Sequence, residues 1–473
     1  MNLSLLIPEW TALGVLLVLL IGEISWKDFS RKYSGLVSLA GCGVVFLALL
    51  LGRNHYGSAF SGTFEVTPLS VFFKMFFILT LAPVIQMARD SFENSMKNPG
   101  EYLLILWCTL IGLFFLASAK DLLLLFISLE IVTLSFYITA AFLKKDLMSI
   151  EAGLKYLILG SLASAFLIYA ISLLYVMTGT TSLDGIRTAS SILNPPPLMM
   201  LSFVFLIAGV GFKIASVPFQ LWVPDVYEGA PSPTVAFLSV GSKAAGFLIG
   251  LKVLVAGFPF LSKELTLLFS VLAALTILYG NLGALLQTNV KRLFAYSSIT
   301  HAGYLMIGIA AGKVSGVQAL LFYLAAYGVS NLAAFSVITL VGKALKNDRL
   351  ETYKGLSQRS PYLAGMMFLA LLSLAGVPPL AGFFGKFYIL LAAVQAGLSW
   401  LALLGLLAVS ISLFYYLTLV KKMYIEESVQ TSPIQVSSGS RVLLAVLALL
   451  IIVVGLWQAP LLSWAGQAAA SLF

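Results

Sequence analysis

Charge and cysteine are scarce in this sequence. Only 10% of its 473 residues are charged, whereas 60% are hydrophobic, and the mean hydropathy is +1.01. A soluble domain of this length needs far more charge to cover its surface, which excludes a soluble globular protein. The only two cysteines, Cys42 and Cys108, both lie in apolar runs. They exclude a cysteine-based zinc or iron–sulfur ligand set and argue against a disulfide framework.

Sequence motifs of common enzyme active sites are missing as well. The sequence has no glycine-rich phosphate loop, no metal-ligand cluster and no nucleophile with a suitable base. The net charge of +9 is typical of nucleic-acid binding, but basic cytoplasmic loops give a membrane protein the same balance. We therefore expect no nucleic-acid partner.

Long apolar runs recur along the whole chain instead. Each is near the ~20 residues that a helix needs to cross the hydrocarbon core, and too long for a barrel strand. The fold class predicted is therefore an all-α polytopic membrane protein. The first run has no basic flank and is interpreted as a retained span rather than a signal peptide. About fourteen spans are expected, at residues 3–21, 33–51, 66–87, 102–118, 121–142, 153–177, 198–222, 233–257, 264–286, 293–311, 316–342, 361–390, 398–420 and 441–464.

Basic residues are distributed unevenly between alternate loops. Because basic loops stay cytoplasmic, the more basic side is predicted to face the cytoplasm and both termini to lie outside. The cytoplasmic loops would carry Lys27, Arg31, Lys32, Arg89, Lys97, Lys144, Lys145, Lys291, Arg292, Lys343, Lys346, Arg349, Lys354, Arg359, Lys421, Lys422 and Arg441. The outer loops and span ends would carry only Arg53, Lys120, Arg187, Lys252, Lys263 and Lys313.

A few titratable residues lie deep inside the predicted spans. They sit seven or more residues from either span end, roughly 10 Å into the membrane at 1.5 Å per residue. A charge there costs about 2.5–3.5 kcal/mol even on the mildest scale, so we predict a polar path inside the protein. Glu130 in LFISLEIVTLSFY is the only acid expected within a span. The full set is Glu130, Lys213, Lys243, His301 and Lys386.

Three of the polar residues within spans have simpler explanations. Lys74 and Lys155 lie close to span ends, where a lysine can extend its ammonium to the membrane surface. His301 is equally compatible with a neutral, hydrogen-bonded core histidine. Function and structure therefore both remain open for these three residues.

Prolines interrupt two spans beside buried lysines. Pro218 follows Lys213 by five residues, and Pro378 and Pro379 precede Lys386 in LAGVPPLAGFFGKF. Proline lacks an N–H and clashes with the carbonyl four residues back, so both helices are expected to break. Broken helices at the membrane midplane are typical of ion pathways. Because the breaks lie five spans apart, they predict two repeats of about five helices, with the span of Glu130 corresponding to the span of His301.

Three segments carry a resemblance to a known family. PFQLWVPDVYEGAPSPTVAFLSVGSKAAGF, NVKRLFAYSSITHAGYLMIG and LAGVPPLAGFFGKFYIL resemble the antiporter-like subunit N family of bacterial proton-pumping NADH:quinone oxidoreductase, respiratory complex I. The likeness covers nearly the whole chain. It implies about fourteen helices with two inverted repeats and broken helices seven and twelve. The chain would divide into 1–101 (three helices), 102–257 (first repeat), 258–422 (second repeat) and 423–473 (loop and last helix).

The resemblance also implies residue roles. Glu130 would be the acid of a charge pair and Lys213 its partner. Lys243 would be the connecting lysine of the eighth span, and Lys386 the lysine of the broken twelfth span. Lys155 and His301 match polar positions of the family's axis. Many relatives have histidine where this chain has Gln220, which cannot titrate.

The implied function is that of a proton-translocating subunit of a translocase. Electron transfer from NADH to quinone, in partner subunits, would drive proton movement here. NADH, FMN, iron–sulfur clusters and quinone would all be bound by partner subunits, and no cofactor by this chain. The expected partners are the antiporter-like subunit M, the small subunits K, J and A, and the lipid bilayer of the bacterial inner membrane.

Three alternatives belong to other classes. A subunit of a Mrp-type cation/proton antiporter, or of a related membrane-bound hydrogenase, would use the same buried lysines with different partners. A non-conducting scaffold would use them only to hold helices together.

Overall fold

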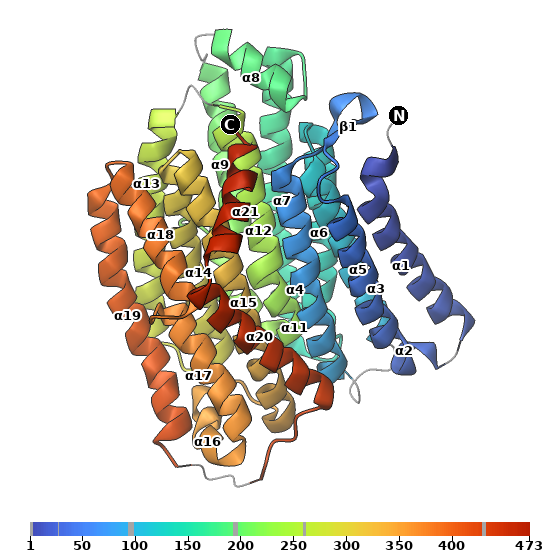
Figure 1. Cartoon of the computed structure of the whole chain (residues 1–473), viewed down its shortest axis with the longest axis vertical. Coiled ribbons are helices and arrows are strands. Elements are labelled where there is room, and N and C mark those ends of the chain that lie inside the picture. Colours follow the sequence, from blue (N-terminus) through green and yellow to red (C-terminus); the bar gives the residue numbers. More distant parts are fainter. Residues whose placement is uncertain (1–2, 27, 93–98, 193–196, 259–261, 428–431) are drawn as a thin grey trace.

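A bundle of long, roughly parallel helices makes up the computed structural model of the chain (Figure 1). It describes residues 3–26, 28–92, 99–192, 197–258, 262–427 and 432–473. Lys27 and Lys97, counted above among the cytoplasmic charges, lie outside the described residues. Both termini lie at the end of the bundle that carries β1 and α8, and α2 and α16 lie at the opposite end (Figure 1).

The helices account for most of the described chain. They are α1 (Ile7–Ser25), α2 (Phe29–Lys32), α3 (Ser34–Gly52), α4 (Pro68–Phe92), α5 (Pro99–Ser118), α6 (Leu122–Ala140), α7 (Leu147–Thr178), α8 (Leu183–Ile192), α9 (Pro197–Ile214), α10 (Trp222–Gly229), α11 (Ser232–Phe237), α12 (Lys243–Ile249), α13 (Ser262–Leu285), α14 (Val290–Ala310), α15 (Val314–Leu345), α16 (Leu356–Arg359), α17 (Pro361–Ala375), α18 (Ala381–Gln395), α19 (Ser399–Tyr424), α20 (Ser438–Leu456) and α21 (Ala459–Ala470).

Short elements complete the bundle. Single 3₁₀ turns occur at Leu3–Leu6, Phe60–Gly62 and Leu350–Tyr353. Two π-helical segments, Leu238–Ser242 and Gly250–Ala256, flank α12 within one continuous helical span from residue 232 to 256. Strands β1 (Gly57–Ala59) and β2 (Phe64–Val66) form an antiparallel hairpin in which Gly57 faces Val66.

The predicted membrane character is confirmed. The described residues contain 13 helices that are long and apolar enough to cross a membrane, and two shorter apolar helices, α17 and α18. The predicted span 361–390 is thus two helices, separated by residues 376–380. The predicted span 198–222 is too long, because α9 ends at Ile214 and α10 is a separate helix after the break.

The last predicted span, 441–464, is also wrong as a single helix. It consists of α20 and α21, separated at Trp457 and Gln458. Gly455 lies against the break between α17 and α18, where a Cβ atom would come within 2.1 Å of the Pro379 carbonyl oxygen. Two helix breaks therefore meet inside the bundle.

Burial separates the inner helices from the outer ones. In α14 and α15, 94% and 89% of the residues in the most apolar window are buried, compared with 33% in α3, α19 and α20. The outer helices present apolar side chains outward, as lipid or a partner subunit requires. The polar residues of interest lie mainly on the inner helices.

Candidate functional site

Lys213 lies at the break between α9 and α10. Its side chain is buried, and its ammonium donates a hydrogen bond to Thr133 Oγ1 on α6 at 2.7 Å. The Trp222 indole donates to the Phe212 carbonyl at 3.1 Å and so satisfies an acceptor at the broken helix end. Gly246 of α12 allows close packing, since a Cβ there would lie 3.1 Å from Lys213 Cβ.

Glu130 lies one turn from Thr133 on the same face of α6. Its carboxylate accepts a hydrogen bond from Ser164 Oγ of α7 at 2.6 Å. Among the ion pairs of the described residues, none joins Glu130 to Lys213. Glu130 and Thr133, the hydroxyl partner of Lys213, lie on neighbouring turns of α6, so the structure brings the first charged pair to the same part of that helix. Glu130 is half-buried rather than enclosed.

Lys243 begins α12 at the centre of the bundle. Its buried ammonium donates to the carbonyl oxygen of Ser298 on α14 and to Ser298 Oγ at 2.9 Å. Ser298 Oγ in turn lies 3.3 Å from the hydroxyl of Tyr227, which belongs to α10. Lys243 is therefore connected to the half-helix that follows the first break.

His301 lies three residues beyond Ser298 on α14 and is buried. Its Nδ1 is 2.6 Å from the Tyr323 hydroxyl on α15, and its Nε2 is 3.3 Å from the Tyr416 hydroxyl on α19. The Tyr416 hydroxyl also forms a hydrogen bond with Ser297 Oγ. His301 therefore has hydrogen-bonding partners on both ring nitrogens, from two different helices.

Lys386 is buried beside the second break. Its ammonium donates to the Ala375 carbonyl at 3.0 Å, which is the last carbonyl of α17. The same nitrogen lies 5.2 Å from the centre of the Tyr304 ring, and that ring meets Tyr323 edge-on at 6.2 Å between centroids. We call the set Lys243, Ser297, Ser298, His301, Tyr304, Tyr323, Tyr416 and Lys386 the central polar chain.

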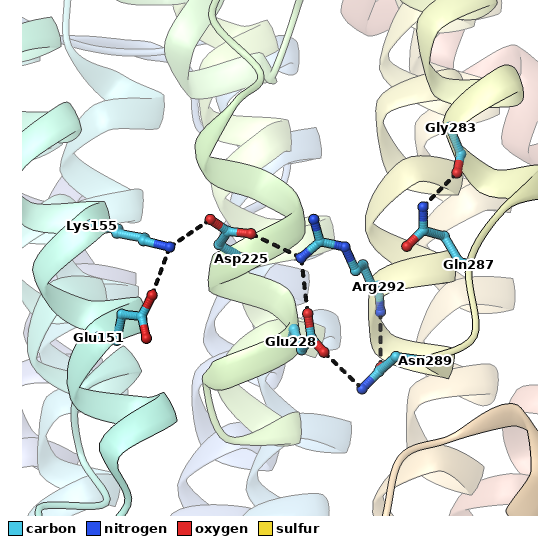
Figure 2. A network of polar contacts seen from close by, with 8 residues as sticks. All are labelled: Glu151, Lys155, Asp225, Glu228, Gly283, Gln287, Asn289 and Arg292. Carbon is cyan, nitrogen blue, oxygen red and sulfur yellow. Dashed lines mark hydrogen bonds and ion pairs between the residues drawn. The ribbon is translucent and has the colours of Figure 1, made fainter.

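Lys155 does not belong to the central polar chain. Its ammonium lies 2.7 Å from Glu151 Oε1 and 2.7 Å from Asp225 Oδ2 in a half-exposed ion-pair network (Figure 2). Arg292 Nη1 extends this network, at 2.9 Å from Asp225 Oδ1 and 2.9 Å from Glu228 Oε2. Partial burial favours the neutral form of Asp225, but the hydrogen bonds from Lys155 and Arg292 are stronger and hold its pKa below the usual value.

The prediction that Glu130 is the only acid within a span is wrong. Glu9 of α1 is also buried within a span, and its Oε1 lies 2.5 Å from Lys74 Nζ of α4. Lys74 is thus neutralised inside the bundle and does not extend to the membrane surface. Lys252, assigned to the outer side, donates to the Ala117 and Ala119 carbonyls at 2.5 and 2.8 Å, where α5 ends.

Sequence reasoning missed the hydroxyl groups of the site. Tyr323 and Tyr416 bind His301, and Thr133 and Ser164 bind the first charged pair, yet none stands out in an apolar span. The paired serines in SSITH were the available signal. Gln220 is 4% exposed, and its Oε1 has no hydrogen-bond partner in the described part of the chain, so this buried oxygen requires water or another donor.

No group of three or more His, Cys, Asp or Glu side chains in the described ranges is arranged to hold a metal ion. The buried titratable side chains of the central polar chain are lysine, histidine and tyrosine, which are groups able to donate or accept protons. Two broken helices with buried lysines define an antiporter-like membrane protein.

Comparisons with known proteins narrow this class. Residues 119–412 match the NADH:quinone oxidoreductase/Mrp antiporter transmembrane family, and the chain belongs to that family. It is 38% identical to the NADH-quinone oxidoreductase subunit N of Moorella thermoacetica over 100% of this chain and 99% of the relative.

Solved structures agree with this assignment. A chain of respiratory complex I from Thermus thermophilus matches with a TM-score of 0.82 and 31% identity, covering 96% of this chain and 98% of that one. A chain of the Mrp complex from a Dietzia species matches with a TM-score of 0.89 and 19% identity, over 100% and 98% of the two chains. The second match shows a shared fold alone. The antiporter-like fold expected from the sequence is confirmed.

Proposed function

We propose that this protein is the proton-translocating, antiporter-like subunit of a membrane-bound NADH:quinone oxidoreductase. The observation that carries the proposal is the central polar chain, which runs from Lys243 to Lys386 through a membrane bundle. Within it, Lys243 is hydrogen-bonded to Ser298, and His301 to Tyr323 and Tyr416, whereas Lys386 meets Tyr304 only across the face of its ring. Hydroxyl, imidazole and ammonium groups can pass protons between hydrogen-bonded neighbours, and water would join these groups to one another. Relatives named as subunit N, aligned over the whole chain, support the same complex.

Each titratable residue has a role in this function. Lys213 exchanges a proton near the first break, with Glu130 setting its proton affinity through their separation. Lys243 passes the proton towards His301, and Lys386 exchanges it near the second break. Lys155 helps to hold the cytoplasmic end of the bundle rather than carrying protons. In the arrangement described here, Lys213 donates to Thr133 and Glu130 accepts from Ser164.

The surroundings of Glu130 on the surface of the bundle support a neighbouring membrane subunit. Glu130 is half-buried between Ile127 and Ile131, which are 57% and 38% exposed on the outer face of α6. A charged carboxylate facing lipid is costly, which supports a neighbouring membrane subunit that covers this face. Subunits M, K, J and A of the same complex are the proposed neighbours.

The redox chemistry is assigned to other subunits. NADH, FMN, iron–sulfur clusters and quinone would be bound there, and this chain would contribute proton movement in the bacterial inner membrane. Both termini would lie on the outer side. The four-part division at residues 101, 257 and 422 separates the three N-terminal helices, the two repeats and the C-terminal segment.

Replacement of the first lysine tests the proposal. Lys213→Ala removes the ammonium at the first break, so NADH-driven proton pumping should fall by roughly tenfold or more. Pumping is measured in inverted membrane vesicles with a pH-sensitive dye, and assembly of the complex by native gel. Lys144→Ala, an exposed lysine near the end of α6, is the control and should pump normally. Normal pumping by Lys213→Ala would rule out the role of this residue.

The Mrp-type alternative makes a different prediction in the same vesicles. A free-standing antiporter would exchange sodium for protons without NADH, and Lys213→Ala would abolish that exchange. A subunit of the oxidoreductase acidifies the vesicles only when NADH and quinone are supplied. The 38% identity over the whole chain to a subunit N favours the oxidoreductase.

A further inference from the structure

The half-helix α10 depends for its position on the helices packed against it rather than on continuity with the helix before it. It has eight residues, which is too short for a helix that is stable by itself. Helical backbone is interrupted between Ile214 and Trp222, so α9 does not fix the rotation of α10. Its position must therefore come largely from contacts with the helices packed against it.

One side of α10 packs closely on α7. Trp222 stacks on Tyr156 with 4.6 Å between ring centroids. At Gly229 a Cβ atom would lie 2.3 Å from the Met148 carbonyl oxygen, so the two backbones are in direct contact. This side of α10 is fixed by packing.

The other side of α10 is charged and faces the start of α14. Arg292 Nη1 lies 2.9 Å from both Asp225 Oδ1 and Glu228 Oε2, and Asn289 Nδ2 donates to Glu228 Oε1 at 3.3 Å (Figure 2). Asp225 and Glu228 are three residues apart, so they lie on one face of α10. A single nitrogen of Arg292 therefore bridges two successive turns.

One of the two residues between these acids, Tyr227, contacts the central polar chain. Tyr227 lies two residues after Asp225 and directly precedes Glu228, and its hydroxyl lies 3.3 Å from Ser298 Oγ. Ser298 Oγ accepts from Lys243 Nζ at 2.9 Å. Arg292 and Ser298 both belong to α14, so any shift of α10 along α14 changes both contacts together.

We propose that Arg292 is a positioning residue that clamps α10 to α14 through Asp225 and Glu228, and so keeps Tyr227 in contact with Ser298 and Lys243. The clamp joins the first break to the second repeat at the cytoplasmic end of the bundle. This inference rests on the proposed function, because Lys243 must carry protons for its hydrogen-bonding environment to matter.

If the clamp only stabilised the fold, its loss would lower the amount of assembled complex. The carboxylates of Asp225 and Glu228 and the Arg292 guanidinium are between 26% and 36% exposed, and ion pairs of that kind stabilise proteins little. Loss of the clamp should therefore leave the amount of assembled complex nearly unchanged. The quantity that should change is pumping for each assembled complex.

The experiment measures NADH-driven pumping in inverted vesicles, divided by the amount of assembled complex on a native gel. Arg292→Gln removes the charge and should lower this ratio roughly fivefold. Arg292→Lys keeps a cation that can reach both carboxylates and should retain most of the ratio. The double variant Arg292→Glu with Glu228→Arg reverses one pair and should recover pumping that Arg292→Glu alone loses.

Lys354→Gln is the matched control. Its ammonium also joins two carboxylates at the cytoplasmic end, Glu351 at 2.5 Å and Glu426 at 3.2 Å, and it is 35% exposed. Because this cluster lies away from α10, Lys354→Gln should pump normally. An unchanged ratio in Arg292→Gln, no recovery in the double variant, or an equal loss in Lys354→Gln would overturn the clamp.

Lys213→Ala in the same vesicles separates the two proposals. If Lys213→Ala is impaired and Arg292→Gln is normal, the clamp is wrong and the proposed function stands. If Lys213→Ala pumps normally, the proposed function itself is wrong at the first break.

Discussion

At the scale of single residues, Lys213, Glu130 and Lys243 are bound by hydroxyl groups rather than by ion pairs. Lys213 and Glu130 each bond to a hydroxyl of a neighbouring helix, and Lys243 bonds to Ser298. A direct ion pair in a low-dielectric interior would hold both charges tightly. Hydroxyl partners stabilise a charge more weakly and can both donate and accept, as a group that gains and loses protons requires.

Tyr416 provides a residue-scale prediction. Its hydroxyl joins Ser297 to Nε2 of His301, so Tyr416→Phe interrupts the central polar chain while keeping the ring. NADH-driven pumping should fall by roughly three- to tenfold, as expected for one lost hydrogen bond. Vesicle acidification, divided by assembled complex, is the measurement.

A second tyrosine serves as the control. Tyr353 is equally buried, and its hydroxyl has no hydrogen-bond partner in the ranges that the structure describes. Tyr353→Phe should therefore pump as the unmodified protein does. If both variants behave alike, Tyr416 does not connect the chain.

The charged members of the site could be predicted from sequence, but their hydroxyl partners could not. A lysine inside an apolar span is costly, so Lys213, Lys243 and Lys386 stand out without any structure. Tyrosine and serine occur in membrane helices for many reasons, and Tyr416 is 119 residues away from Ser297 in the chain. Only the packing of α14 against α19 shows that they meet. Glu9 was missed because it lies close to the end of its span.

At the scale of elements, prolines revealed two of the three helix breaks discussed above, at 215–221 and 376–380. Pro218 and the Pro378–Pro379 pair mark the breaks in the predicted spans 198–222 and 361–390. The break between α20 and α21 has no proline inside it, because Pro460 lies in the first turn of α21, where proline is tolerated. Its place depends on contact with the second break, which is a tertiary property.

Gly455 provides the element-scale prediction. A Cβ atom at this position would meet the Pro379 carbonyl oxygen at 2.1 Å and the Leu380 carbonyl carbon at 2.8 Å. Both belong to backbone, which cannot rotate away, so Gly455→Ala should destabilise the protein by about 1–3 kcal/mol. The melting temperature of the detergent-solubilised protein should fall accordingly.

Gly365 in α17 is the opposite case and makes a matched control. A Cβ atom on this glycine would have no atom within 4 Å outside its own helix backbone and chain neighbours. Gly365→Ala should therefore be neutral or stabilise the protein by up to about 1 kcal/mol through helix propensity. Equal melting temperatures for the two alanine variants would contradict the close contact at the breaks.

At the scale of the whole molecule, charge and apolar surface define how the bundle sits in a membrane. Arg31 and Lys32 belong to α2 and Arg359 to α16, which lie at one end of the bundle, and both termini lie at the other end (Figure 1). The sequence predicted this division because loop charges are visible without structure. Which outer helices face lipid and which face a partner could not be predicted, because both surfaces are apolar.

The orientation can be tested with two single cysteines. Asn347 lies in the exposed turn after α15, at the proposed cytoplasmic end, and Asn54 lies in the exposed turn after α3, at the proposed outer end. Cys42 and Cys108 are first replaced by serine to remove background labelling. In intact cells, a membrane-impermeant thiol reagent should label Asn54→Cys and leave Asn347→Cys unmodified. In inverted vesicles the pattern should reverse, because the cytoplasmic end then faces the reagent. Labelling of Asn347→Cys in intact cells, with protection of Asn54→Cys, would place the termini in the cytoplasm and overturn the proposed orientation.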